Sequence, residues 1–203
     1  MILAIDTSTA NCSAAIFADD GALIDARDEV IGRGHAERLM PMVKELLAGR
    51  FPGQILIGCG PGSFTGLRVG LAAAHGMAIG WDIPLAGMSS LALLAAGAPG
   101  DGPVAAALTG GHGELFVQAF DRPPLAPVGE LLNLPPDTAA TSIATALVVG
   151  TGAALLVEAR GSGEALDLYP SVSNAFLLPA PLRTLEPRPL YGRAPDARPR
   201  QAA

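Results

Sequence analysis

The chain has 203 residues, half of them apolar but only 4% aromatic, and a formal net charge of −6 at pH 7. This length accommodates one compact domain or two small lobes, and the acidic balance argues against a protein that grips nucleic acid unaided, because phosphate neutralisation needs a basic face. Cys12 and Cys59 are too few and too far apart for a disulfide framework or a zinc site, so a reducing, cytoplasmic environment fits best.

The N-terminal segment of the chain is predicted to form three strands. Residues 2–5 are a short apolar run that ends at Asp6, and a polar turn leads from there into a second strand-like run at 12–18. The dipeptide Asp-Gly at 20–21 is a strong hairpin signal before a returning strand at 22–29. The sequence therefore predicts three consecutive antiparallel strands.

A helix is predicted over 35–49, where leucine and valine side chains recur at helical spacing. Pro41 lies inside it and is expected to bend the helix or to mark a late start, and Gly49 is expected to end it. A buried strand at 54–58 then leads through a glycine-rich loop into a second helix at 64–80.

The second helix has one face with almost no side chains. Gly66, Gly70, Ala74 and Ala78 recur every four residues, so another element is expected to pack closely against them. Two interpretations remain open, namely ordinary packing within the lobe and a flat surface that a partner helix covers. The mean hydropathy of +0.40 leaves a similar choice between an alanine-rich composition and a surface covered by a partner.

A strand at 83–87 and a helix at 89–97, with Ser89 or Ser90 as its N-terminal cap, complete the first half. Residues 83–100 carry no charge, but prolines and glycines interrupt them. A membrane helix is therefore not expected there.

The segment APGDGP at 98–103 is the best candidate for a boundary between lobes. The predicted organisation is an N-terminal lobe at 1–98, a shortened C-terminal lobe at 99–186 and an Arg- and Pro-rich tail at 187–203. Each half begins with a hairpin of strands and continues with helix and strand, which indicates two related α/β lobes with a cleft between them.

In the second half, strands are predicted at 104–108 and 115–120, on either side of the turn TGGHGE. The Pro-rich segment 123–136 is expected to be a loop, followed by a weak helix at 137–146 and a strand at 147–150. The tail is locally basic and is either a solvated terminus or a binding element. From position 183 onward, arginines stand at 183, 188, 193, 198 and 200.

The glycine loop does not fit a phosphate-binding motif. A Walker loop needs Lys after its last glycine, whereas Gly66 is followed by Leu67 and Arg68. Pro61 also removes a backbone donor from the middle of a dinucleotide-type fingerprint. The simplest role for Ser63 in this loop, shared with the nearby Thr65, is to cap the helix that follows.

The segment DTST at 6–9 leaves two interpretations open. Asp6, with the hydroxyls of Thr7 and Ser8 beside it, can hold a metal-bound nucleotide phosphate, or Asp6 can accept a hydrogen bond from its own backbone in a turn. The three histidines are far apart and no His-x3-His pair or nucleophile elbow is present, so neither a metal site nor nucleophilic catalysis is indicated.

Five motifs together resemble the TsaB family, also called YeaZ: ILAIDTST, HAERLMP, GCGPGSFTGLRVGLAAAHGMA, PLAGMSSL and PLYGR. The resemblance is continuous through the first half of the chain and thin thereafter. GPGSFTGLR is specific to this family and its sister family TsaD, and HAERLMP favours TsaB. The resemblance implies the two-lobed α/β fold of the actin-like ATPases, the ASKHA fold shared with sugar kinases and Hsp70.

The resemblance also implies a role in the synthesis of N6-threonylcarbamoyladenosine at position 37 of tRNA (t6A37). TsaB-like proteins are non-catalytic scaffold and dimerisation subunits that bind and activate the TsaD transferase. TsaD chains carry a His-x3-His metal pair, which this sequence lacks. The implied partners are a TsaD-like transferase, a TsaE-like ATPase and a second copy of the chain, with tRNA reached only through the complex and no membrane. No intrinsic cofactor is implied, and ATP or ADP is expected only at the complex interface.

Two other hypotheses are kept beside this one. The first is an enzyme of the same fold that acts by itself, a nucleotide-dependent kinase or carbamoyltransferase with Asp6 and Thr7 on the phosphates. The second is direct binding of tRNA by the Arg-rich tail, which the overall acidity disfavours.

In the family, the helices that match 35–48 and 66–80 form the face that meets TsaD or another TsaB copy. Transferred to this sequence, the resemblance assigns eight residues to that interface: His35, Arg38, Leu39, Met42, Gly66, Arg68, Gly70 and Ala74. One departure concerns the second hairpin, where many relatives have Asp-Ala-Arg and this chain has Thr-Gly-Gly at 109–111.

Overall fold

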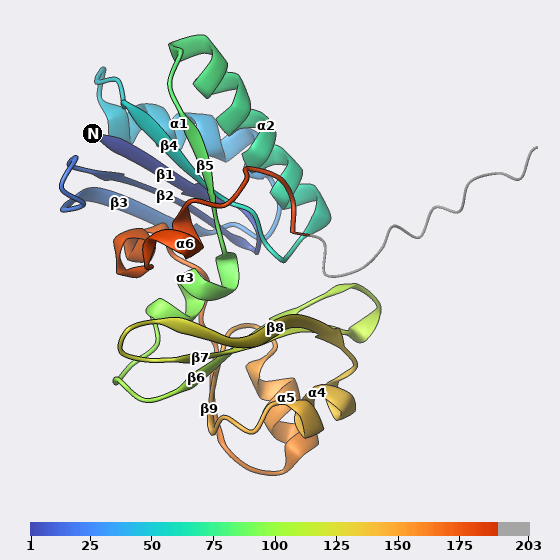
Figure 1. The fold of residues 1–203 in the computed structure, drawn as a ribbon. Helices are drawn as coiled ribbons and strands as arrows, with labels where there is room; N and C mark the ends of the chain where they lie inside the picture. Colours follow the sequence, from blue (N-terminus) through green and yellow to red (C-terminus); the bar gives the residue numbers. More distant parts are fainter. Residues whose placement is uncertain (191–203) are drawn as a thin grey trace, which may run out of the picture.

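A computed structural model describes residues 1–190 of the chain, which form two lobes, each built on a five-stranded sheet with helices packed on it (Figure 1). The expected two-lobed α/β architecture is therefore confirmed. The tail arginines at 193, 198 and 200 lie outside the described residues. None of the helices in the described part is long and apolar enough to cross a membrane.

The first lobe opens with the three antiparallel strands that the sequence predicts. Two further strands lie parallel to the first, giving the order β3-β2-β1-β4-β5. β1 and β2 are buried along their whole length, because elements cover both faces of the sheet. The strands are β1 (Ile2–Asp6), β2 (Asn11–Phe17), β3 (Leu23–Val30), β4 (Gln54–Gly58) and β5 (Leu85–Met88).

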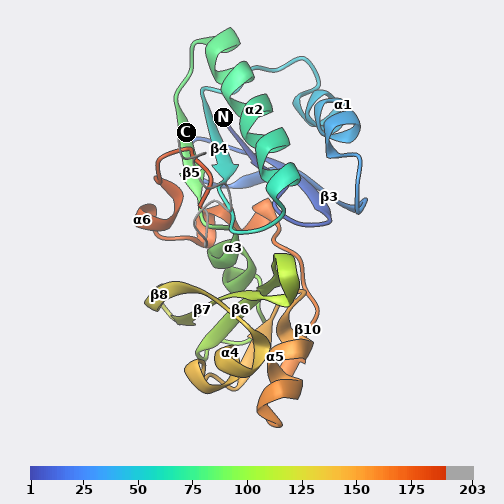
Figure 2. The ribbon, with the colours of Figure 1, turned by 90° about the vertical axis from the view of Figure 1, so that its right-hand side faces the viewer.

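Helices α1 (His35–Leu47) and α2 (Phe64–Trp81) pack on one face of this sheet and lie side by side, as Figure 2 shows. The buried residues of α1 recur at helical spacing, as predicted. Pro41 lies inside α1, which begins at His35, so a late start at Pro41 is wrong. Ala48 and Gly49 follow in left-handed conformation, with φ of 47° and 84°, and end the helix.

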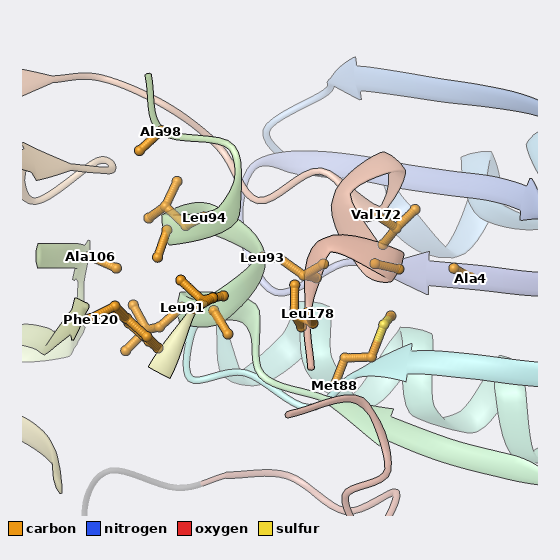
Figure 3. Packing of buried hydrophobic residues seen from close by; sticks show 14 of the residues in the cluster. Ala4, Met88, Leu91, Leu93, Leu94, Ala98, Ala106, Phe120, Val172 and Leu178 are labelled. Carbon is orange, nitrogen blue, oxygen red and sulfur yellow. The ribbon is translucent and has the colours of Figure 1, made fainter. Parts of the chain in front are cut away.

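The other face of the first sheet is covered by short elements that also connect the lobes. They are α3 (Ser90–Ala96), the 3-10 helix η2 (Val172–Leu177) and α6 (Ala180–Arg183). α3 is buried between the lobes, and the cluster around it combines Ala4 of β1 with Ala106 and Phe120 of the second sheet (Figure 3). One hydrophobic core therefore runs through both lobes.

The second lobe repeats the plan of the first, with antiparallel strands followed by parallel ones. Its strand order is β10-β9-β6-β7-β8, and α4 and α5 pack together on one side of the sheet. The elements are β6 (Val104–Thr109), the 3-10 turn η1 (Gly111–Gly113), β7 (Leu115–Asp121), β8 (Ala126–Leu134), α4 (Pro136–Ser142), β9 (Leu147–Val149), α5 (Ala153–Arg160) and β10 (Glu164–Leu166).

The segment predicted as a Pro-rich loop is mostly strand β8, so that prediction is wrong. β8 is an edge strand, where a proline does not interrupt a ladder on both sides, and Pro127 pairs with Phe120. A register shift between Val117 and Ala119 accommodates Gly129, whose φ is 76°. The predicted helix at 137–146 is also shorter, because α4 ends at Ser142.

The C-terminal segment returns to the first lobe, so the predicted second lobe at 99–186 extends too far. The last strand of the second sheet ends at Leu166. Beyond it, Gly87 of β5 exchanges two backbone hydrogen bonds with Leu185, with N···O distances of 2.7 and 3.0 Å, and the backbone N–H of Leu190 donates to Cys59 at 2.8 Å. The end of the described chain therefore covers the β5 edge of the first sheet.

Candidate functional site

Asp6 is a fully buried carboxylate at the end of β1. Its Oδ1 accepts hydrogen bonds from the backbone N–H of Ser8 at 2.8 Å and from Ser8 Oγ at 2.7 Å, while Oδ2 accepts one from Ser90 Oγ at 2.6 Å. Ser90 Oγ in turn accepts from the N–H of Gly60 at 3.1 Å. Burial raises the pKa of Asp6, and the hydrogen bonds from Ser90 and Ser8 only partly oppose that rise.

Gly58, at the end of β4, makes room for this carboxylate. A Cβ atom on Gly58 would lie 1.8 Å from Asp6 Oδ2, so any other residue here would displace the Asp6 carboxylate or the strands that carry it. Gly58 was not among the residues predicted to form a site. The local sequence carries no signal for this role, because it depends on the pairing of β1 with β4.

The turn after Asp6 is fastened to the start of α2. Thr7 Oγ1 donates to the carbonyl of Gly66 at 2.8 Å, and the N–H of Ser63 donates to the carbonyl of Ser8 at 2.7 Å. Ser63 Oγ accepts from the N–H of Gly66 at 3.2 Å, which confirms Ser63 as the helix cap. The glycine loop, which contains a cis bond between Gly60 and Pro61, is thus a strand-to-helix connection.

In the structure, the segment DTST forms the turn in which Asp6 accepts hydrogen bonds from Ser8. Asp6, Thr7 and Ser8 are at most 1% exposed, and their side-chain oxygens are bonded within the chain. They present no free group to a phosphate in this conformation. Burial also raises the pKa values of Cys12 and Cys59 to about 11, so neither thiol is an activated nucleophile near neutral pH.

The small-residue face of α2 packs inside the lobe. A Cβ on Gly66 would lie 2.1 Å from the carbonyl oxygen of Thr7, and one on Gly70 would lie 2.3 Å from Thr7 Oγ1. Ala74 is fully buried in the cluster between the sheet and the two helices. Of the two interpretations of this face, packing within the lobe is therefore the correct one.

The opposite face of α2 is open. Nothing lies within 4 Å of a Cβ built on Gly76 or Gly80, and Ile79 is 80% exposed. At the start of the helix, the guanidinium of Arg68 lies 3.5 Å from the centroid of the Phe64 ring, which is itself 55% exposed.

A hollow of about 610 Å³ lies where α1 and α2 both end. Its wall includes an edge-to-face aromatic pair, Phe51 and Trp81, with ring centroids 6.0 Å apart. Its lining includes Met40, Lys44, Leu47, Arg50, Phe51 and Trp81. We call this hollow the α1–α2 groove, and we call the outer faces of both helices, with Phe51, the α1–α2 surface.

Comparison with known proteins identifies the family. Residues 28–157 match the family model described as TsaD, tRNA N6-adenosine threonylcarbamoyltransferase. The structure of YeaZ from Pseudomonas aeruginosa superimposes with a TM-score of 0.78 at 30% identity, over 94% of this chain and 98% of that one. The chain belongs to the TsaB (YeaZ) family.

Two sequence relatives, one of them a curated TsaB, extend this comparison. The tRNA threonylcarbamoyladenosine biosynthesis protein TsaB of Escherichia coli is 38% identical over 129 residues, which are 60% of this chain and 55% of the relative. The chain thus spans about half the length of that curated TsaB. An uncharacterized protein of Mycobacterium tuberculosis is 34% identical over 98% of this chain and 94% of its own length.

Most residues assigned to a TsaB partner interface are not on the surface of this chain. His35, Leu39, Met42, Gly66, Gly70 and Ala74 are buried against the chain's own sheet and turn, so their assignment as surface contacts is corrected. They are buried because the apolar and small faces of α1 and α2 both point towards the sheet. Only Arg38 and Arg68 of the eight remain accessible.

Arg38 is held by neighbours on its own lobe. Its guanidinium bonds Glu29 of β3 at 2.6 Å and Glu45 of α1 at 3.1 Å. His35, at the start of α1, is 7% exposed and its Nε2 has no hydrogen-bond partner within residues 1–190. In this TsaB chain, apart from Arg38 and Arg68, the accessible residues of the two helices are ones that the resemblance did not assign, such as Met40 and Ile79.

The second-lobe hairpin differs from that of many TsaB relatives. In place of Asp-Ala-Arg, the segment 109–111 leads into the 3-10 turn η1, where His112 and Gly113 have φ of 58° and 77°. Glu114, which the chain retains, accepts a hydrogen bond from Asn133 of β8 at 2.6 Å. The retained Glu114 therefore ties β7 to the neighbouring strand.

Proposed function

We propose that this chain is a non-catalytic scaffold and dimerisation subunit in the synthesis of N6-threonylcarbamoyladenosine on tRNA. It binds and activates a TsaD-like transferase through the α1–α2 surface, and it forms a homodimer through the same surface when alone. A TsaE-like ATPase joins the complex, and tRNA is reached only through it. ATP or ADP, where it takes part, is bound at the complex interface.

The observation that carries this proposal is the uncovered, apolar character of the α1–α2 surface. Met40 is 45% exposed, Phe51 72% and Ile79 80%; Met40 and Phe51 both line the α1–α2 groove, and Ile79 lies on the open face of α2. Soluble monomers rarely leave several large apolar side chains together in water, and Met and aromatic residues are enriched at interfaces. A partner that covers this surface would remove them from solvent.

The names of the relatives support a role in tRNA threonylcarbamoyladenosine synthesis. Matched proteins carry the name tRNA threonylcarbamoyladenosine biosynthesis protein TsaB, and the transferase family model covers α1 and α2 of this chain. A transferase that shares this segment has helices of its own in the corresponding place. Related helix pairs can pack face to face in a heterodimer as they do in a homodimer, which supports one surface for both assemblies.

The rival hypothesis, an independent kinase or carbamoyltransferase, requires Asp6 to reach a phosphate or its metal. Both carboxylate oxygens of Asp6 instead bond Ser8 and Ser90, and Thr7 is bonded to Gly66. Calorimetry of the purified chain with ATP and magnesium tests this point. Tight binding that Asp6→Asn abolishes would favour the enzyme over the scaffold.

The interface is tested with charges placed on exposed positions. We expect Met40→Glu and Ile79→Glu each to weaken binding of the TsaD-like transferase at least tenfold, because a desolvated charge costs more than about 1.4 kcal/mol. Their unfolding midpoints should stay near that of the parent chain, since both side chains are in solvent. Val128→Glu, at a 50% exposed position on the second lobe, is the matched control and should bind normally.

Reconstitution tests the role in modification. Transferase, TsaE-like ATPase, threonylcarbamoyl-adenylate and tRNA are combined with and without this chain, and modified adenosine is measured by mass spectrometry. We expect formation of the product to depend on the chain and to fall with Met40→Glu. Full activity without the chain would refute the scaffold role.

A further inference from the structure

We propose that the α1–α2 groove is the anchor site for one element of the transferase, an apolar segment that carries a carboxylate. This inference rests on the proposed function, because it specifies which chemistry of the partner the α1–α2 surface recognises. It concerns a hollow that contains none of the eight residues assigned by family resemblance.

The walls of the groove are suited to an apolar side chain. Leu47 is buried beneath it, and Phe51 stands 72% exposed with its ring edge-to-face with Trp81. An aromatic pair of this kind offers a large apolar area with little rotamer freedom to lose on binding. Pockets lined by aromatic residues and arginine are also where binding energy concentrates in protein interfaces.

The charged groups of the groove are all positive. Lys44 and Arg50 belong to its lining, and no acidic residue does. The guanidinium of Arg50 donates to the carbonyls of Leu46 and Leu47 at 3.0 Å, which fixes it at the end of α1. Glu45, the acid next to Lys44, is engaged by Arg38 at 3.1 Å.

Lys44 is the free cation of this site. Within residues 1–190 its ammonium group has no ion pair, although the whole chain carries a net charge of −6. An unpaired cation beside an apolar hollow calls for an anion when a partner excludes water from the groove. Two cations in an apolar setting are too few for a nucleic-acid backbone, and they match a carboxylate among apolar side chains.

The chain offers two unique reporters in this groove. Lys44 is its only lysine and Trp81 its only tryptophan. A carbodiimide condenses an amine and a carboxylate in direct contact into an amide. The other amine, at Met1, is paired with Asp19 and lies outside the groove. A cross-link at Lys44 therefore reports a carboxylate at this site.

The experiment uses the complex of the full chain with the TsaD-like transferase of the same organism. After carbodiimide treatment, we expect mass spectrometry to find Lys44 joined to an Asp or Glu of the transferase. Titration with the transferase should shift the Trp81 emission, with the Trp81→Phe chain giving the background. Lys44→Glu should weaken binding at least tenfold.

Two control variants test whether the positive charge of Lys44 itself is required for binding. Lys44→Arg keeps the cation and should bind like the parent chain while losing the cross-link. Arg33→Glu makes the same kind of charge reversal on an exposed residue near the start of α1 and should bind normally.

The outcomes distinguish this inference from the function on which it rests. If the complex forms but Lys44→Glu has no effect and Lys44 forms no cross-link, the groove is not the anchor and the scaffold role stands. If Lys44 is cross-linked only to a second copy of the chain, the transferase is not the occupant. If no complex forms at all, the proposed function fails and the inference with it.

Discussion

Asp6 illustrates what a short motif can and cannot predict. The turn in which Asp6 accepts from Ser8 is local, and the motif DTST predicted it as one of two alternatives. The bond from Ser90 joins residues 84 positions apart, and the space left by Gly58 depends on the pairing of β1 with β4. Neither feature leaves a signal in the local sequence.

The raised pKa of Asp6 gives a prediction on pH. Because the folded chain holds this proton more tightly than the unfolded chain, the contribution of Asp6 to stability is largest below about pH 4 and is lost as the pH rises. Asp6→Asn cannot ionise. We expect the free energy of unfolding of the parent chain to fall relative to that of Asp6→Asn between pH 4 and pH 7.

Urea unfolding followed by the fluorescence of Trp81 measures both chains at each pH. Ser90→Ala is the informative companion, since it removes one hydrogen bond that favours the ionised form, raises the folded-state pKa further and should enlarge the total loss of stability as the pH rises. Unfolding free energies of the parent chain and Asp6→Asn that run parallel across this range would contradict the prediction.

At the scale of elements, helix α2 has two faces poor in side chains that serve different purposes. The face with Gly66 and Gly70 packs against the turn at Thr7, whereas Gly76 faces open space. The sequence identified the first face by its regular spacing and left its partner open. Only the fold decided that the partner is the chain's own turn, because that turn is distant in sequence from α2.

The two faces predict opposite effects of the same substitution. Gly70→Ala should lower the free energy of unfolding by about 2 kcal/mol, because its Cβ would overlap Thr7 Oγ1. Gly76→Ala should raise it by about 0.5–1 kcal/mol, because alanine favours the helix and nothing lies near its Cβ. Thermal or urea unfolding of the two variants measures the difference.

This pair contains its own control, because both substitutions add one methyl group to the same helix. Equal effects of the two variants would show that the inner face of α2 has room to adjust. If Gly70→Ala is destabilising as expected, a bulky charge at Gly70 would unfold the lobe and could not be used to map the partner surface.

Strand β8 is the element that the local sequence pattern failed to predict. Pro127, Gly129 and the prolines on either side of the strand indicate a loop, and pattern alone offered no reason to place a strand there. Pairing with β7 supplies the missing stabilisation, and the edge position tolerates Pro127. Tertiary pairing therefore overrides the local preference.

At the scale of the whole molecule, the two lobes share one core. The cluster around α3 joins Ala4 of the first sheet to Ala106 of the second, and the returning C-terminal segment adds Val172 and Leu178 (Figure 3). Separate unfolding of one lobe would expose this shared surface. We therefore expect the described part of the chain to unfold in a single transition.

Leu178→Ala tests the shared core. Leu178 is 2% exposed, so the substitution should cost about 3 kcal/mol. Hydrogen exchange should accelerate to the same extent in β1 and in β6 if the lobes open together. Leu155→Ala, at a 43% exposed leucine of the second lobe, is the matched control and should change stability by no more than about 0.5 kcal/mol. Acceleration confined to one lobe would refute the single transition.

The sequence by itself determined the opening strands, the helices at α1 and α2, the caps and the family, because each depends on local periodicity, turn chemistry or a contiguous motif. The tertiary structure decided which face of α2 is buried, that β8 is a strand, and that the C-terminal segment returns to β5. It also gathered Lys44, Arg50, Phe51 and Trp81 around one groove. These features depend on contacts between residues far apart in the chain, which local patterns do not encode.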